Sequence, residues 1–305
     1  MERLQFDNIN SLEAQVSGLP KAQLETLHRG KAFKKSDDED SGAYMNLNDV
    51  ECDDPQADAL NKHVAIVNTE TDEIANVVSK RYDLVQHRKA LDPIVDALKH
   101  IGRGVEGEIR KYQGGNSVVL KVKFDESFEV EGDSDYIQGF TVRNSFDRSS
   151  SLKLSGYVER VVCSNGMVLQ ESVAPTLKRK HFGRVKTEEE YKEWMEELLE
   201  LSPQIKRTIE GMADDWIKIE HVEDALRHVG IPKSKAGEIA GRVEEMDRTE
   251  TEVSRRGLYN AITNYITHDM EGDVALSTEQ KYQKKAQKMV TKPVKELEVP
   301  IEDGE

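Results

Sequence analysis

Positively charged side chains gather in the segment from Leu177 to Lys186, which reads LKRKHFGRVK and which we call the basic run. A histidine and a phenylalanine lie between its lysines and arginines. Clustered cations bind phosphate groups, and an aromatic ring among them can stack on an unpaired base. We therefore expect the basic run to contact single-stranded nucleic acid, unless the acidic helix that follows neutralises it. The residues expected to make contact are Lys178, Arg179, Lys180, Phe182, Arg184 and Lys186.

Further cations precede the basic run in a region where apolar and polar residues alternate. Arg143 and Arg148 lie near a polar turn and are the next candidates for phosphate contact. If several of these side chains share a face with the basic run, they form a continuous binding groove. The other cations of this region are Lys121, Lys123, Lys153 and Arg160.

Residues with catalytic potential lack the spacing that a reaction requires. Cys163 could act as a nucleophile with His181 or His87 as its base, but its apolar surroundings, ERVVCSNGM, favour a buried structural cysteine. His221 and His228 lie seven positions apart in the sequence, a spacing that matches no common zinc motif. We expect no catalytic residue, no metal site and no cofactor.

Two weaker patterns remain. The segment Gly102–Gly107 matches a glycine-rich phosphate loop, but it follows a predicted helix instead of a strand and is expected to be a connector. A metal-dependent enzyme using Asp147, His181 or His268 is an alternative that no spacing supports.

The composition limits the class of protein. The chain has 305 residues and a formal net charge of −15 at pH 7, which excludes nonspecific nucleic-acid binding by the whole surface but not by a local groove. Acidic residues are dense between positions 36 and 54, and this segment could bind a partner or mimic nucleic acid. The low cysteine count and the lack of a signal-peptide core or a long apolar stretch predict a soluble cytoplasmic protein without a membrane helix.

The region that positions these residues reads as antiparallel β-structure. The stretch Tyr136–Gln170 alternates on both sides of a polar turn and contains an Asn165-Gly166 pair, which predicts hairpin-connected strands. Earlier in the chain we expect strands at His63–Asn68 and within Glu73–Gln86, a helix over Arg88–Ile101 with Pro93 in its first turn, and a hairpin over Glu108–Phe124.

After Gln170 the apolar period changes to that of helices. Thr187 and Glu190 form a capping box, Ser202 precedes Pro203 as the expected cap of the next helix, and Ser234 is expected to cap another. The fold class is therefore α+β, with an antiparallel sheet crossed by one helix and followed by helices. The expected segments are an acidic, partly flexible one at 1–60, a sheet domain at 61–186, a helical region at 187–270 and a lysine-rich helix with a tail at 271–305.

Several blocks of the sequence resemble the phage/plasmid-like family catalogued as domain of unknown function nine hundred thirty-two. The main blocks are SKRYDLVQHRKALDPIVDAL at 79–98, FTVRNSFDRSSSLKL at 140–154 and YVERVVCSNGMVL at 157–169. KHFGRV at 180–185 and RGLYNAITNYITHD at 256–269 resemble two further family motifs, although Tyr259 stands where a tryptophan-containing segment is usual. The family has no settled activity, so the resemblance implies only a plasmid, prophage, archaeal or viral setting.

We therefore expect a non-enzymatic, oligomeric DNA-binding protein, with single-stranded DNA binding or annealing in recombination or replication as its role. The element order is also similar to that of single-strand annealing proteins. The alternative is a structural or protein-interaction module, in a virion or a counter-defence complex, that does not bind nucleic acid. In a viral setting the protein would work in the host cytoplasm.

Overall fold

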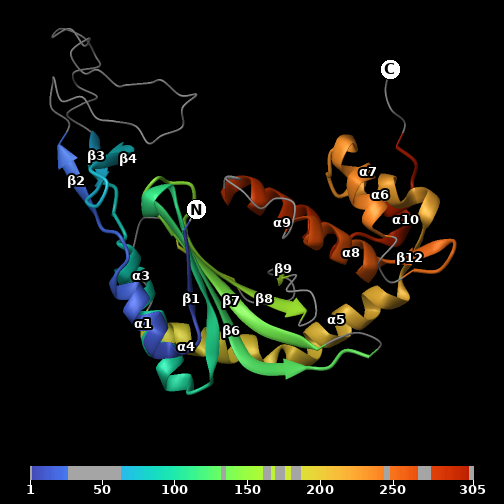
Figure 1. The fold of residues 1–305 in the computed structure, drawn as a ribbon, viewed down its shortest axis with the longest axis horizontal. Coiled ribbons are helices and arrows are strands. Elements are labelled where there is room, and N and C mark those ends of the chain that lie inside the picture. The colour runs from blue at the N-terminus through green and yellow to red at the C-terminus, as the bar shows by residue number, and fades with distance from the viewer. Residues whose placement is uncertain are drawn as a thin grey trace, which may run out of the picture. The chain divides into compact units, whose positions relative to one another are not determined.

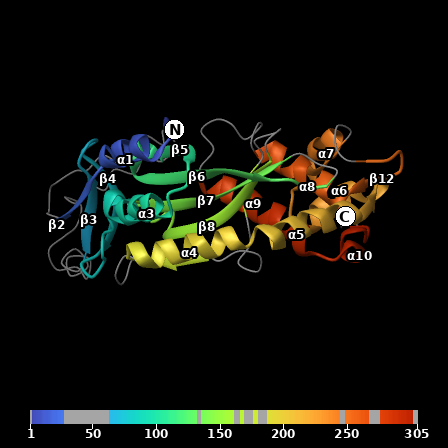
Figure 2. The ribbon, with the colours of Figure 1, turned by 90° about the horizontal axis from the view of Figure 1, so that it is seen from below.

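The chain has the expected α+β fold, with antiparallel sheets and C-terminal helices (Figures 1 and 2). The computed structural model describes residues 2–26, 63–131, 135–160, 166–168, 176–179, 187–243, 248–266 and 276–301. These residues divide into two compact units, and three long strands contribute to both. The first unit comprises residues 1–123, 141–154 and 176–196, and the second comprises residues 124–140, 155–175 and 197–305.

The largest sheet has seven strands in the order β1-β5-β6-β7-β8-β10, with β9 paired to β8. The hairpins predicted from alternation are confirmed, because β5, β6, β7 and β8 are neighbours in both sequence and sheet. Where the pairing is resolved at the residue level, β1 runs antiparallel to β5, and β8 to β9. The strands are β1 (Glu2–Phe6), β5 (Val105–Tyr112), β6 (Ser117–Phe128), β7 (Tyr136–Ser145), β8 (Leu152–Arg160), β9 (Gly166–Val168) and β10 (Thr176–Arg179).

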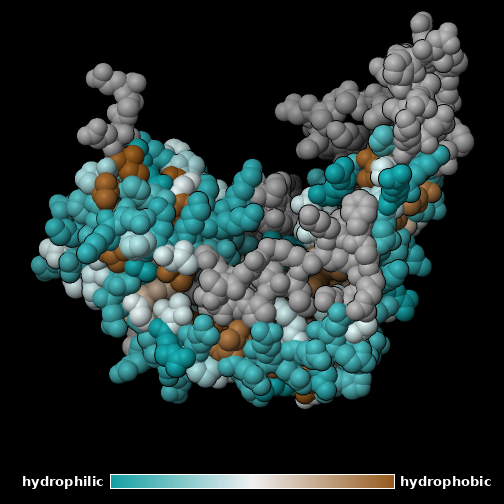
Figure 3. Space-filling view, turned by 180° about the vertical axis from the view of Figure 1, so that it is seen from behind, coloured by the Kyte–Doolittle hydropathy of each residue, from teal (hydrophilic) through white to brown (hydrophobic). Residues whose placement is uncertain are grey.

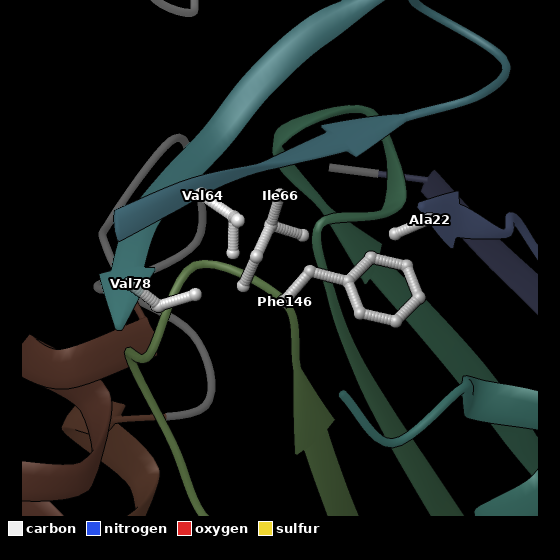
Figure 4. Packing of buried hydrophobic residues seen from close by; sticks show 5 residues of the cluster. All are labelled: Ala22, Val64, Ile66, Val78 and Phe146. Carbon is white, nitrogen blue, oxygen red and sulfur yellow. The ribbon is translucent and has the colours of Figure 1, made fainter. Parts of the chain in front are cut away.

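A smaller antiparallel sheet in the first unit has the order β2-β3-β4, formed by β2 (Ala22–Thr26), β3 (His63–Asn68) and β4 (Glu73–Ser79). Strand β3 has the predicted bounds. One side of this sheet packs on Phe146, which lies at the start of the turn between β7 and β8 (Figure 4). Phe146 thus joins the small sheet to the polar turn of the large one.

The N-terminal residues contribute to the first unit. Residues 2–26 form β1, the helix α1 (Ile9–Ser17) and β2, none of which the sequence pattern indicated. A reciprocal capping box starts α1, in which Asn8 accepts a hydrogen bond from the backbone of Ser11 and Ser11 accepts one from that of Asn8. The acidic segment 36–54 and the domain boundaries expected near residues 60, 186 and 270 lie outside the described residues.

The predicted helix of the first unit is α3 (His87–Ile101). Its apolar residues recur with the helical period and are buried, while Gly102 ends it in the left-handed conformation at φ 70°. Pro93 lies in the helix interior and not in the first turn as expected, because more than one helical turn separates it from the start of the helix at His87. The glycine-rich segment then leads into β5, which confirms it as a helix-to-strand connector.

Helix α4 (Glu188–Glu200) begins at the predicted capping box. The Thr187 backbone N–H donates to Glu190 Oε2 at 2.8 Å, and the Glu190 N–H donates to Thr187 Oγ1 at 3.3 Å. Two other expected caps are displaced, because Leu201 caps the next helix in place of Ser202, and Pro232 occupies the cap expected at Ser234.

The helical part of the second unit contains a two-stranded ribbon, β11 (Trp216–Lys218) with β12 (Glu252–Ser254). The residues of α8 are buried up to Thr263, and Arg255 at its start forms an ion pair with Asp215 at 2.9 Å. The helices are α5 (Ser202–Asp214), α6 (Val222–His228), α7 (Lys233–Arg242), α8 (Arg255–Asn264), α9 (Leu276–Thr291) and α10 (Val294–Leu297).

Candidate nucleic-acid interface

The structure describes part of the basic run. Lys178 and Arg179 lie in β10, at the end of the strand order of the large sheet. The rest of the predicted contact set, namely Lys180, Phe182, Arg184 and Lys186, lies outside the described residues, as do Cys163, His181 and His268.

The strands of the first unit have a helix-covered face and an opposite face. In β7, Asn144 lies within hydrogen-bonding distance of His87 of α3, so the alternating neighbour Arg143 points to the opposite face. Phe140 shares the face of Asn144, and its ring lies 6.0 Å from that of Phe124 in β6. Alternation along β6 then places its lysines on the same face as Arg143.

The opposite face collects cations from five strands, and we call it the cationic sheet face. On β5 and β6, Arg110 contacts Glu108 and Lys123 contacts Glu106, and the charges of Arg3 and Lys121 also act on the Glu108 carboxyl. In β8, Lys153 alternates with the buried Leu152 and Leu154 and is assigned to this face. The cationic sheet face comprises Arg3, Arg110, Lys121, Lys123, Arg143 and Lys153.

Two glutamates of β5 order this surface. Glu106 forms an ion pair with Lys123, with 2.7 Å between Oε1 and Nζ. Glu108 is buried, accepts a hydrogen bond from Arg110 Nε at 2.6 Å and another from Gln5 at 3.0 Å. Burial opposes ionisation of Glu108, but the charge and hydrogen bonds of Arg110, aided by other nearby cations, hold the pKa of its carboxyl below the ordinary value. Part of the positive charge is therefore balanced within the sheet.

Arg148, which was predicted together with Arg143 as a candidate for phosphate contact, is exposed in the turn between β7 and β8. Its φ of 66° is a left-handed conformation that is uncommon for a residue with a side chain. The neighbouring Asp147 braces the turn, because its carboxylate accepts a hydrogen bond from the Ser149 backbone at 2.8 Å and from Ser117 Oγ at 3.0 Å. These hydrogen bonds hold the backbone of the turn in place and so position the Cα atom of Arg148.

A buried polar network lies beneath this turn. His87 Nε2 lies 2.9 Å from the Gly115 carbonyl, and His87 Nδ1 lies 2.9 Å from the Asn144 amide nitrogen. The Asn144 amide also donates to the Val85 carbonyl at 3.0 Å, and the His87 ring stacks on Phe146 with centroids 3.9 Å apart. Burial lowers the pKa of His87 to about 4, so the ring is neutral at pH 7.

This network accounts for His87 as a structural residue. Its Nε2–H donates to a carbonyl and its Nδ1 accepts from an amide, so both ring nitrogens are engaged in the core. A general base needs a nitrogen that can reach a reacting proton. The geometry therefore gives no support to His87 as the base for a cysteine nucleophile.

The remaining catalytic candidates also have structural contacts. Asp147 braces the turn described above, and His228 Nε2 lies 2.7 Å from the Val299 carbonyl. His221 lies 3.6 Å from its neighbour Glu220. Within the described ranges, no group of three or more histidine, cysteine or acidic side chains is arranged to hold a metal ion.

Sequence reasoning missed Arg3 and Arg110 as members of the cationic sheet face. Arg110 lies in the predicted hairpin and alternates with buried residues, so its face could have been assigned from the period of the strand. Arg3 reaches this face because β1 pairs with β5 in the register that places Arg3 opposite Arg110. No local pattern in the first residues indicates that distant pairing.

The surface and the helices add two observations. Figure 3 shows one side of the molecule, on which hydrophobic residues form small separate patches among hydrophilic ones. Over the part of the chain that the structure describes, every helix is too short or too polar to span a membrane.

Comparison with known proteins gives a family but no described activity. Neither the curated proteins nor the solved structures include a match to this chain. A family model described as "Domain of unknown function (DUF932)" matches residues 75–295, which contain all five of the blocks on which the resemblance was based. The chain belongs to the DUF932 family.

Proposed function

We propose that this protein is a non-enzymatic, single-stranded DNA-binding protein whose contact surface is the cationic sheet face together with the basic run. The observation that carries the proposal is the gathering of cations from β1, β5, β6, β7 and β8 on one sheet face in a chain of net charge −15. In a chain with this excess of acid, an anionic ligand would account for the gathering of these cations on one face.

The chemistry of this surface suits a phosphate backbone. Arg110 and Lys123 are held by glutamates, which fixes their positions and reduces the entropy lost when they bind an anion. Strand β10 carries Lys178 and Arg179 at the other edge of the same sheet. Phe182, in the continuation of the basic run, supplies a ring for base stacking.

The family context extends this proposal to a role. We infer a mobile-element or viral protein that acts on DNA during recombination or replication, as a homo-oligomer in the host cytoplasm. The antiparallel sheet with one crossing helix is also consistent with a relationship to single-strand annealing proteins, which is an analogy of fold and carries no function by itself.

The test is a salt titration of DNA binding. Fluorescence anisotropy of a labelled oligothymidine is measured with the wild-type chain and with the variant Lys121→Gln/Lys153→Gln. Each lost phosphate contact is expected to reduce the slope of log K against log salt by about 0.7, so the double variant should lose roughly 1.4. The matched control is Lys192→Gln/Lys206→Gln, which removes the same charge from helix surfaces.

Two results would contradict the proposal: absence of salt-sensitive binding by the wild-type chain, or an equal response of the two double variants. The alternative is a structural or interaction module, for which the acidic surface of α4 is the relevant observation, since Glu189, Glu193, Glu196 and Glu197 are exposed. Light scattering during size exclusion, with and without the oligonucleotide, separates the two. An assembly that ignores DNA supports the interaction module.

A further inference from the structure

A second group of cations lies on α9, within the second unit. Lysines occupy positions 281, 284, 285 and 288 of this helix, and the spacing i, i+3, i+4 and i+7 places side chains on one helix face. Lys281, Lys284 and Lys288 are exposed, and Lys285 is half-buried. We call these four residues the lysine face of α9.

Among the described residues, no carboxylate forms an ion pair with the lysine face. Half-buried lysines on other helices differ in this respect. Lys192 lies 3.9 Å from Glu196 and Lys206 lies 3.7 Å from Glu210, each one helical turn away. On α9, by contrast, lysines lie three or four residues apart, and like charges at that spacing repel one another and destabilise a helix. The lysine face therefore carries a repulsion that the described part of the fold does not offset, and an anionic ligand would offset it.

The electrostatics of Lys285 report the same repulsion. Partial burial, together with the charges of Lys288 and Lys281, lowers the pKa of the Lys285 ammonium below its ordinary value. The two neighbouring lysines thus lie close enough to Lys285 for their charges to oppose its own. A bound phosphate would weaken this repulsion.

Two tyrosines lie beside the lysine face. The Lys285 ammonium lies 4.4 Å from the centroid of the Tyr282 ring, which is a cation–π contact. The Tyr282 ring is half-buried and lies 5.8 Å from the ring of Tyr265. Lys235 and Arg242 of α7 lie 5.6 Å and 5.9 Å from the Tyr265 centroid, so cations of a second helix adjoin the same aromatic pair.

We propose that the lysine face of α9, with Tyr282, is a second contact surface for single-stranded DNA. This inference rests on the proposed function and adds a site to it that the basic run and the cationic sheet face do not include. The lysines contact backbone phosphates, and Tyr282 positions Lys285 and offers a ring edge to an unstacked base. Lys281 and Lys288 are separated by about 10 Å along the helix axis, so the lysine face can contact more than one phosphate of a strand.

An anionic membrane surface is the other class of partner for a basic helix, and the structure favours DNA over it. Membrane-surface helices insert an apolar face between lipids. The apolar residues Ala286 and Met289 of α9 are fully buried in the fold, at 1% and 0% exposure, so they are not available for insertion.

The experiment compares two triple variants of the full chain. Lys281→Gln/Lys284→Gln/Lys288→Gln removes three charges from the lysine face, and Lys192→Gln/Lys206→Gln/Lys292→Gln removes three ion-paired charges elsewhere. Binding of a labelled oligothymidine is followed by anisotropy over a salt series. The first variant is expected to bind roughly tenfold more weakly at low salt, with a slope reduced by about 2, whereas the control stays within about twofold of the wild-type chain.

Each outcome decides the inference. Equal binding by the two triple variants overturns it, and if Lys121→Gln/Lys153→Gln is still impaired, the proposed function remains. A wild-type chain that does not bind the oligonucleotide removes both. Vesicles containing phosphatidylserine test the lipid reading, because loss of vesicle binding with unchanged DNA binding also overturns the inference. Thermal melting excludes unfolding, since removing repulsion within α9 should leave the melting temperature unchanged or raise it.

Discussion

The cationic sheet face of the first unit and the lysine face of the second unit hold their charges in different ways. On the sheet, Arg110 is bonded to the buried Glu108, and Lys123 to Glu106. On α9, the lysines project from one side of a helix, and no described carboxylate pairs with them. The charges of the cationic sheet face therefore take part in contacts that hold the fold together, whereas those of the lysine face do not. Substitution should therefore affect stability mainly in the first unit and ligand binding in both.

The largest stability effect is expected at the network beneath the sheet turn. The unfolded chain protonates His87 near pH 6.5, but the folded chain does so only near pH 4, so the folded state binds fewer protons between these values. The contribution to stability is complete above about pH 6.5 and is lost as the pH falls toward about 4, by about 3 kcal/mol in total. Urea unfolding over this range measures the loss.

The variant His87→Gln serves as the reference for this pH dependence, because it removes the titrating group from both states. The difference in unfolding free energy between the variant and the wild-type chain should shrink as the pH falls. A difference that stays constant from pH 7 to pH 4.5 would show that His87 titrates normally in the folded chain. NMR titration of the wild-type imidazole provides the same decision without any variant.

The second effect concerns the buried carboxylate of the cationic sheet face. Glu108→Gln removes the charge that holds Arg110 and is expected to destabilise the chain by about 2 kcal/mol, since hydrogen bonds to charged groups are stronger than neutral ones. It also makes the surface more positive. If fixed geometry matters more than net charge, oligonucleotide binding weakens; tighter binding would assign the role to net charge alone. Glu106→Gln, at the exposed member of the pair of glutamates, is the control.

A third effect has the opposite sign. Arg148 has a left-handed backbone that glycine adopts without strain, so Arg148→Gly should stabilise the chain by roughly 1 kcal/mol and raise the melting temperature by about 2–4 °C. DNA binding should weaken in the same variant. Arg148→Lys retains the charge and the strain and separates the two contributions. A melting temperature that falls in Arg148→Gly would contradict the assignment of strain to this turn.

The smallest effect is expected on α9. Lys284→Gln removes one repelling charge and should change stability by only a few tenths of a kcal/mol, in the stabilising direction. Differential scanning calorimetry at low salt is the appropriate measurement, because salt screens the repulsion. A clear loss of stability would show that the lysine face is structural and would remove the contrast with the cationic sheet face.

Local patterns predicted most elements of the sheet correctly. The alternation in β6, β7 and β8 reflects one buried face, and the apolar period of α3 reflects a helix packed on that face. The pairing of β1 with β5 depends on contacts between residues about a hundred positions apart, and the alternation within β1 covers only four residues, Arg3 to Phe6. Positions of caps were less reliable, since Leu201 and Pro232 took places expected for serines.

The candidate site was less predictable than the fold. A lysine-rich C-terminal helix was apparent in the sequence, but the lack of ion pairs between its lysine face and the described carboxylates depends on what packs around α9. The role of His87 likewise depends on Gly115, in the turn between β5 and β6, and on Asn144 of β7, which are both distant from it in sequence. Sequence spacing identifies charged side chains, whereas tertiary contacts decide which of them remain available to a ligand.

The packing of Phe146 has a consequence for local opening of the chain. Its ring is buried against both His87 and the small sheet, and its backbone N–H donates to the Asn116 carbonyl at 2.7 Å. Surface turns usually exchange their amide hydrogens rapidly through small fluctuations. The Phe146 amide cannot do so without separating two packed groups at once. We expect it to exchange with solvent as slowly as the central strands, although it lies at the start of a turn.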